Sequence, residues 1–301
     1  LGKKKIFFIL SAVVIIAGFV TMGVHKGNGG DALNYSLEFK GGTSTSVEFN
    51  EDMSIEELDE KVVPIIEEIS KDANVQTQKV QGSNQVIFKS ATLDVSQREE
   101  LNSRLEEEFG VDPEKITAET ISSTISSEMR TGAVSAVVVS TVLMLLYVWF
   151  RFKDVRFGAS SVAALVHDVL VVLAFYAAAR VSVGNTFIAC MLTIVGYSIN
   201  ATIVIFDRIR ENMTSYKTKE ELATIVNRSI SQTLSRSIFT SLTTFIMVAV
   251  LYILGVSSIK EFALPLMVGI ACGTYSSICL ASAFWYLLRT RVGGKKAEKD
   301  K

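Results

Sequence analysis

Six long apolar runs dominate this sequence of 301 residues. Five of them contain no charged residue, and the sixth is interrupted only by His167 and Asp168. Each run is about long enough for a helix to cross a hydrocarbon core of roughly 30 Å. The runs cover residues 6–24, 131–150, 157–179, 181–206, 237–258 and 262–288. We therefore predict an α-helical membrane protein with six transmembrane helices.

The first apolar run follows three lysines, Lys3, Lys4 and Lys5, as the core of a signal peptide does. However, it is longer than a usual signal-peptide core, and no small-residue cleavage motif follows it. We interpret residues 1–24 as an uncleaved first transmembrane helix, and residues 131–288 as the five-helix remainder of the membrane domain.

Basic residues gather in alternate segments between the predicted helices. With the N-terminus inside, the inner segments hold most of the 30 Lys and Arg residues, including those of the tail at 289–301. The short outer loops keep only Arg180 and Lys260. Because cytoplasmic segments are enriched in Lys and Arg, this distribution places both termini and the basic tail in the cytoplasm.

A long polar segment, residues 25–130, separates the first two predicted helices and is expected to lie outside. Its alternating and amphipathic stretches follow the β-α-β-β-α-β order of a ferredoxin-like α+β domain. The strands are expected at 43–49, 74–80, 84–90 and 114–121, and the helices at 54–71 and 96–110. Ser54 and Glu57 form a capping-box pattern at the first helix, and Pro64 is expected to kink or break that helix.

A few polar side chains interrupt the spans, where they are costly unless paired and are therefore candidates for an ion relay. These candidates are Asp168 in the third span, Asn200 in the fourth, Asp207 at the end of the fourth and Arg236 at the start of the fifth. Asp207 follows Asn200 by seven residues and so lies on nearly the same helix face.

Three of these candidates, Asn200, Asp207 and Arg236, also have a purely structural interpretation. Asn200 could hold two helices together by a hydrogen bond. Asp207 could pair with Arg210 in a cytoplasmic cap. Arg236 could reach back to the membrane surface, since it follows a segment rich in Lys and Arg. Against this, apolar residues continue beyond it for a full span. The sequence leaves these alternatives open.

Gly269 and Gly273 place two small residues on one face of the sixth helix, which predicts close helix packing; a chance pair of glycines is the alternative. Cys190, Cys272 and Cys279 all fall within spans and form no C-x-x-C pair, so we interpret them as small apolar filler. We expect no metal site.

The sequence offers little support for an enzyme. It has no glycine-rich phosphate-binding loop, and His25 and His167 are its only histidines. An intramembrane protease would need a second carboxylate in mid-span beside Asp168. We expect no catalytic residues, no cofactor and no nucleic-acid partner.

Four motifs carry a resemblance to a known family. They are LEFKGGTS at 37–44, LVHD at 165–168, GYSIN-TIVIFDRIREN around the fourth span and LSRSIFTSLTTF at 234–245. On these motifs, and over nearly its whole length, the chain resembles SecF proteins, membrane subunits that assist bacterial protein export. The fourth-span motif is long and specific, whereas any other motif alone would be weak.

This resemblance implies membership of the RND superfamily, in which six-helix halves pair about a pseudo-twofold axis. The other half would be SecD, and the expected location is the bacterial inner membrane. Further implied partners are the SecYEG channel, exported polypeptide chains and membrane lipid. The pair would use a proton or sodium gradient to move or release exported chains on the outer side. An RND-type half that exports small molecules is the alternative.

One residue departs from the family pattern. SecF proteins typically read Asn-Asp-Thr where this chain reads Asn200-Ala201-Thr202. The resemblance credits the missing aspartate with ion coupling, and places Arg236 at the family's functional arginine. Either coupling rests on a SecD carboxylate near Arg236, or the protein is less ion-driven than its relatives, or the substitution is engineered. We favour the first interpretation.

Overall fold

The computed structural model describes the whole chain except residues 3, 73–74, 81–82, 153, 216–220 and 298–301. The chain divides into two compact units, one of residues Leu1–Asn34 with Ser135–Lys301 and the other of Tyr35–Val134. The first helix continues to Gly27, and the polar residues from Ser123 onward already belong to a long helix.

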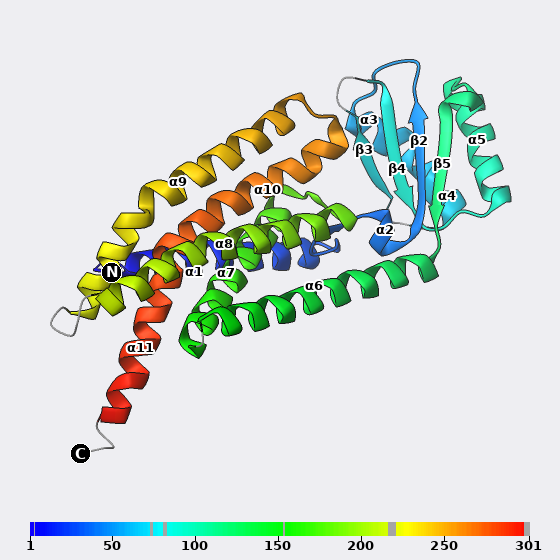
Figure 1. Ribbon diagram of the computed structural model, residues 1–301. Coiled ribbons are helices and arrows are strands. Elements are labelled where there is room, and N and C mark those ends of the chain that lie inside the picture. The colour runs from blue at the N-terminus through cyan, green and yellow to red at the C-terminus, as the bar shows by residue number, and fades with distance from the viewer. Residues whose placement is uncertain (3, 73–74, 81–82, 153, 216–220, 298–301) are drawn as a thin grey trace. The chain divides into compact units, whose positions relative to one another are not determined.

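The α+β unit has the predicted order of strands and helices (Figure 1). A short helix α2 (Leu37–Lys40) precedes strand β2. The remaining elements are β2 (Gly42–Glu48), α3 (Ile55–Lys61), α4 (Val63–Ser70), β3 (Gln76–Lys79), β4 (Gln85–Ser90), α5 (Val95–Phe109), η1 (Pro113–Lys115) and β5 (Ile116–Ile121).

The four strands form one antiparallel sheet in the order β3-β4-β2-β5. Thr45 of β2 lies opposite Phe88 of β4 and Ala118 of β5, which fixes the register. Apolar residues of the sheet and of α3, α4 and α5 bury one another in a single core, whose fully buried members include Val47, Leu58 and Leu105. Burial of these side chains is the main force that holds the unit together.

Local hydrogen bonds set the helix ends of this unit. Ser54 and Glu57 form the predicted capping box, and the helix breaks at Val62, so that Pro64 lies in the first turn of α4 rather than inside a continuous helix. A second capping box joins Asp94 to Gln97 at the start of α5. The backbone N–H of Gln97 holds the pKa of the Asp94 carboxyl below its usual range.

Within its described residues the chain has six helical spans long and apolar enough to cross a membrane. These spans confirm the predicted number of transmembrane helices. They are α1 (Lys4–Gly27), α6 (Ser123–Phe152), α7 (Val155–Ala179), α8 (Asn185–Ser215), α9 (Leu222–Leu254) and a sixth span made of α10 (Ser257–Tyr275), η2 (Ser276–Ala281) and α11 (Ser282–Ala297). Two-residue strands, β1 (Asn34–Tyr35) and β6 (Ser182–Val183), lie at the ends of connecting segments.

The sixth span contains a π-helical segment, η2, that the sequence did not predict. A π-helical turn inserts one extra residue into an α-helix and often marks a functional site. Here the segment begins at Ser276 and Ser277, whose hydroxyls both bond to the carbonyl of Gly273. Pro265 lies earlier in the same span, inside α10.

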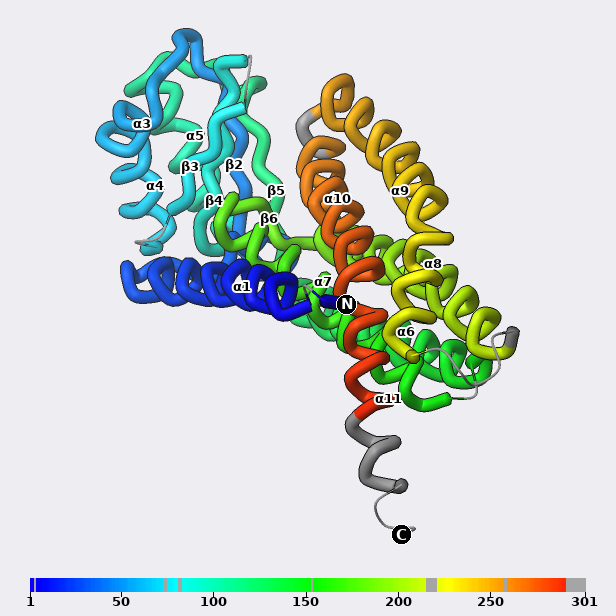
Figure 2. The backbone as a smooth tube through the Cα atoms, turned by 90° about the vertical axis from the view of Figure 1, so that its left-hand side faces the viewer, coloured from blue at the N-terminus to red at the C-terminus, as the bar shows by residue number. Residues whose placement is uncertain are grey.

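Glycines allow two pairs of helices in the membrane unit, α1 with α7 and α10 with α8, to approach closely. A Cβ atom added at Gly18 of α1 would lie 2.1 Å from the Cβ of Ala174 in α7. One added at Gly269 would lie 2.2 Å from Ile194 in α8, and one at Gly273 would lie 3.2 Å from Ser198 in α8. The predicted glycine pair therefore faces α8 of the same chain. Figure 2 shows α10 beside α9 as well, and these two helices are in contact.

A cluster of aromatic side chains packs between α7, α8 and α11 in the membrane unit. The indole of Trp285 stacks on the ring of Phe157 with centroids 4.8 Å apart, and Phe206 packs against Phe157 at 4.9 Å. Trp285 and Phe206 are fully buried. These rings join α11, α7 and α8, so aromatic packing holds these three helices together.

We expect Gly269→Leu to destabilise the membrane unit, because the leucine would occupy the space of Ile194 and force α10 away from α8. Overpacking of this kind costs about 1–3 kcal/mol, and a fall in the melting temperature of the detergent-purified chain measures it. Gly158→Ala is the control, since a Cβ at Gly158 meets no atom within 4 Å. Equal melting temperatures for the wild type and Gly269→Leu would contradict the close packing.

Candidate functional site

Asp168, on α7, is a carboxylate buried at the centre of the membrane unit. Its side chain is 1% exposed. Ser198 of α8 donates a hydrogen bond from Oγ to Oδ2 at 2.5 Å, and Ser276 of η2 donates to the same oxygen at 2.7 Å. A buried carboxylate is tolerated only when its oxygens are hydrogen-bonded, so these two hydroxyls fasten three helical elements around one acceptor.

The second carboxylate oxygen faces a different set of atoms. Oδ1 lies 3.0 Å from Nδ1 of His167 and accepts from Sγ of Cys272 at 3.3 Å. The interpretation of Cys272 as apolar filler is therefore wrong for this residue. The thiol is a donor to a carboxylate, placed there because α10 packs against α7.

His167, Asp168 and Cys272 could also hold a metal ion, since their possible ligand atoms lie within 4.8 Å of one another. Among the described residues, no other group of three or more His, Cys, Asp or Glu side chains could do so. Nitrogen and sulfur ligands of this kind suit zinc. The sequence missed this grouping because 104 residues separate Cys272 from Asp168. A signal was present in the spacing of Cys272 and Ser276, which lie on one helix face at i and i+4.

Further hydroxyls join α8 to η2 next to Ser198 and Ser276. Thr202 Oγ1 and Ser277 Oγ lie 3.0 Å apart, and Ser277 donates to the backbone carbonyl of Ser198 at 3.3 Å. All of these residues are buried. They lie where Gly273 lets η2 approach α8, so the glycine packing and the polar cluster depend on each other.

A second polar feature is a cavity of about 70 Å³ between α8 and α9. It brings Asn200, Ala201 and Arg236 together, three residues that the sequence singled out. The other lining residues are Tyr197, Val204, Ser237, Thr240 and Ser241. Asn200 and Arg236 are exposed in the single chain, whereas Ser237 and Ser241 are buried.

The position of Arg236 corrects a prediction. Arg236 does not open the fifth helix, because α9 begins at Leu222 and Arg236 lies well inside it. The residues from Leu222 to the arginine are polar enough to read as a loop, yet they form an amphipathic extension of α9 whose apolar side is buried at Ile225 and Val226. The arginine therefore faces the cavity from the middle of a continuous helix.

Asp207 has a different partner from the one predicted. Its Oδ2 accepts a hydrogen bond from Arg151, at the end of α6, at 2.8 Å. Arg210 instead donates to the backbone carbonyl of Arg151, and Arg208 pairs with Glu211. The i, i+3 pairing was wrong because the end of α6 brings a competing guanidinium to α8. Asp207 is not among the residues that line the Arg236 cavity.

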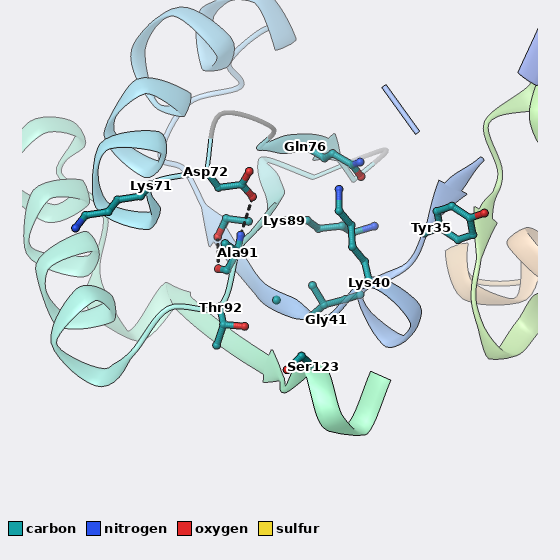
Figure 3. Close-up of a pocket in the computed structure, with 13 residues that line it drawn as sticks. Tyr35, Lys40, Gly41, Lys71, Asp72, Gln76, Lys89, Ala91, Thr92 and Ser123 are labelled. Carbon is teal, nitrogen blue, oxygen red and sulfur yellow. Dashed lines mark hydrogen bonds between the residues drawn. The ribbon is translucent and has the colours of Figure 1, made fainter. Parts of the chain in front are cut away.

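The α+β unit has its own pocket, of about 340 Å³, beside the LEFKGGTS motif (Figure 3). Lys40, Gly41 and Gly42 of the motif line it, with Lys89 of β4 and Asp72 among the other residues. The Asp72 carboxylate accepts from the backbone N–H of Ala91 at 2.8 Å. Gly42 has φ of +124°, and a Cβ there would lie 2.3 Å from the carbonyl oxygen of Ser90. Only glycine fits this backbone.

Comparison with known proteins identifies the family. The family described as "Protein export membrane protein SecD/SecF, C-terminal" matches residues 101–291, which include Asp168, Ala201 and Arg236. The chain is 36% identical over 299 residues to the protein translocase subunit SecF of Sebaldella termitidis, across 99% of this chain and 94% of that protein. This chain belongs to the SecD/SecF family.

Two other SecD/SecF relatives are longer. The protein translocase subunit SecDF of Bacillus subtilis is 33% identical across 99% of this chain, which spans 38% of that protein. The crystal structure of SecDF from Thermus thermophilus, a translocon-associated membrane protein, matches with a TM-score of 0.80 at 35% identity, across 96% of this chain and 39% of that one. The fold of this chain is thus that of one part of SecDF.

We expect Ser198→Ala and Ser276→Ala each to lower the free energy of unfolding by about 2 kcal/mol, because each removes a hydrogen bond to a buried carboxylate. Ser161→Ala is the matched control. Ser161 is equally buried, but among the described residues its hydroxyl donates only to the Phe157 carbonyl of its own helix. Melting temperatures of the purified variants provide the measurement. A loss in Ser161→Ala as large as in the other two would show that Asp168 does not hold these helices together.

Proposed function

We propose that this chain is the SecF half of a protein-export complex, which works with SecD and the SecYEG channel. It would assist the ion-gradient-driven movement or release of exported polypeptides on the outer side of the membrane. The observation that carries the proposal is full-length similarity to SecF together with similarity to only 38–39% of fused SecDF proteins. In those proteins the remaining length would supply the SecD part. The translocase names of these relatives favour export over the transport of small molecules.

The proposed location is the bacterial inner membrane, with both termini in the cytoplasm and the ferredoxin-like α+β unit outside. The excess of Lys and Arg in the inner segments supports this orientation. The side chains of α1, α6 and α9 support a lipid or partner environment, since many large apolar residues on these helices are exposed in the single chain.

The surface that meets SecD would include the Arg236 cavity. Asn200 of α8 and Arg236 of α9 are exposed in the single chain, and large apolar side chains beside Arg236 on α9, among them Ile238 and Phe239, are exposed too. A guanidinium stays charged in any environment, and a charge inside a membrane span faces a protein interior or a water-filled cavity in nearly every case. Neither Asp168 nor Asp207 serves as its acceptor here, because Asp168 bonds to hydroxyls and Asp207 bonds to Arg151. A SecD carboxylate would fill that role, and Asp168 would be the second carboxylate of the ion relay.

Cysteine labelling tests the orientation. A membrane-impermeant maleimide added from the outer side is expected to modify Ser83→Cys in the α+β unit and to leave Thr214→Cys, near the end of α8, unmodified. Lysed cells, in which both variants should react, provide the control. The reverse labelling pattern would contradict the proposed topology.

Export by membrane vesicles tests the role of the polar groups. We expect Arg236→Ala to reduce export much more than Asp207→Ala, since only the first residue faces the proposed SecD surface. We also expect Ala201→Asp to leave the fold intact and to strengthen the dependence of export on the ion gradient, measured with and without an ionophore.

Matched amounts of SecD and of the variant chain in the vesicles are the control for this assay. Equal and small losses in the two alanine variants would remove Arg236 from the mechanism. Unchanged ionophore sensitivity in Ala201→Asp would show that position 201 has no part in ion coupling. Failure of SecD to co-purify with the wild-type chain would contradict the proposed function as a whole.

A further inference from the structure

The cavity between α8 and α9 is lined by one positive charge and by no negative charge. Arg236 is the one charged residue among the eight that line it, and none of the eight is a carboxylate. The wall opposite includes the methyl group of Ala201, which leaves the space unfilled. The cavity thus combines a fixed positive charge with room beside it, inside a helix pair that is apolar over most of its length.

Hydrogen-bond donors accompany the guanidinium. Ser237, next to Arg236 in the chain, is 6% exposed, and its Oγ has no hydrogen-bond partner among the described residues. Asn200 and Thr240 add an amide and a hydroxyl to the lining. A buried hydroxyl without a partner is unfavourable, so this arrangement favours a ligand that accepts hydrogen bonds.

We propose that this cavity binds a small monovalent anion, chloride, between Arg236 and Ala201. A volume of about 70 Å³ is several times the roughly 15 Å³ that a single water-sized sphere requires, so chloride fits with room for an accompanying water. One negative charge neutralises the guanidinium, whereas a divalent anion would leave a net negative charge in the span. The anion would stand in the place of a carboxylate side chain at position 201.

The anion site goes beyond the proposed export function and is compatible with it. A guanidinium has five N–H donors in a planar fork. An anion on the Ala201 side leaves donors on the exposed side of Arg236 for a carboxylate of another subunit. Arg236 would then be held from both sides, which fixes the orientation of its side chain in the membrane.

Thermal denaturation of the purified full chain tests the site. Sodium chloride is replaced stepwise by sodium gluconate at constant ionic strength and pH, and the melting temperature is recorded. We expect chloride to raise the melting temperature with a saturable dependence on its concentration. We also expect Ala201→Asp to abolish this response, because its carboxylate occupies the site, and Ser237→Ala to weaken chloride binding about tenfold.

Arg228→Gln provides the matched control, since Arg228 lies on the same helix but does not line the cavity. This variant should keep the full chloride response, and Arg236→Gln should lose it. Absence of a saturable response in the wild type would overturn the proposal, as would a response that Ala201→Asp and Arg236→Gln retain. The assay does not measure export, so a negative result would leave the proposed export function standing.

Discussion

A carboxylate in the middle of a membrane protein must be hydrogen-bonded on both oxygens, and Asp168 meets this requirement by drawing on three helical elements. Ser198 and Ser276 donate to one oxygen, and His167 and Cys272 lie against the other. The donors reach the carboxylate because Gly273 lets η2 approach α8 at Ser198. The positions of α7, α8 and the sixth span are therefore set together by one polar cluster and one contact between small residues.

The Arg236 cavity differs from the Asp168 site in where the partners of its charged group come from. The hydrogen-bond donors to Asp168 come from its own chain, whereas no carboxylate lines the cavity that the Arg236 guanidinium faces. The cavity lies between α8 and α9, and Asn200 and Arg236 remain exposed there. No carboxylate lines this cavity, and Ala201 contributes only a methyl group to it. Because an unpaired charge in hydrocarbon is costly, a negative group supplied by a partner or a bound ion would have a large energetic effect here.

The α+β unit could be predicted from the sequence almost element by element, because its signals are local. Alternation gave the strands of the sheet, the Ser54 capping box and Pro64 gave the ends of α3 and α4, and Gly110 gave the end of α5. The six spans were equally clear, since apolar length is a property of the chain alone. Helix ends were less predictable. The polar start of α9 resembled a loop, whereas in the structure it is helical and buries Ile225 and Val226.

The sequence by itself determined that this chain has six segments long and apolar enough to span a membrane, the order of strands and helices in the α+β unit, and which few polar residues lie in the apolar segments. These properties follow from hydropathy and from signals a few residues apart. Only the tertiary structure decided how the polar residues are paired. In the structure Cys272 donates to Asp168, which lies 104 residues away in the chain, and Asp207 pairs with Arg151 rather than with Arg210. Arg236 and Ala201 line the same cavity. Helix packing determines these partners, because it decides which side chains from distant segments come within hydrogen-bond distance of a charged group.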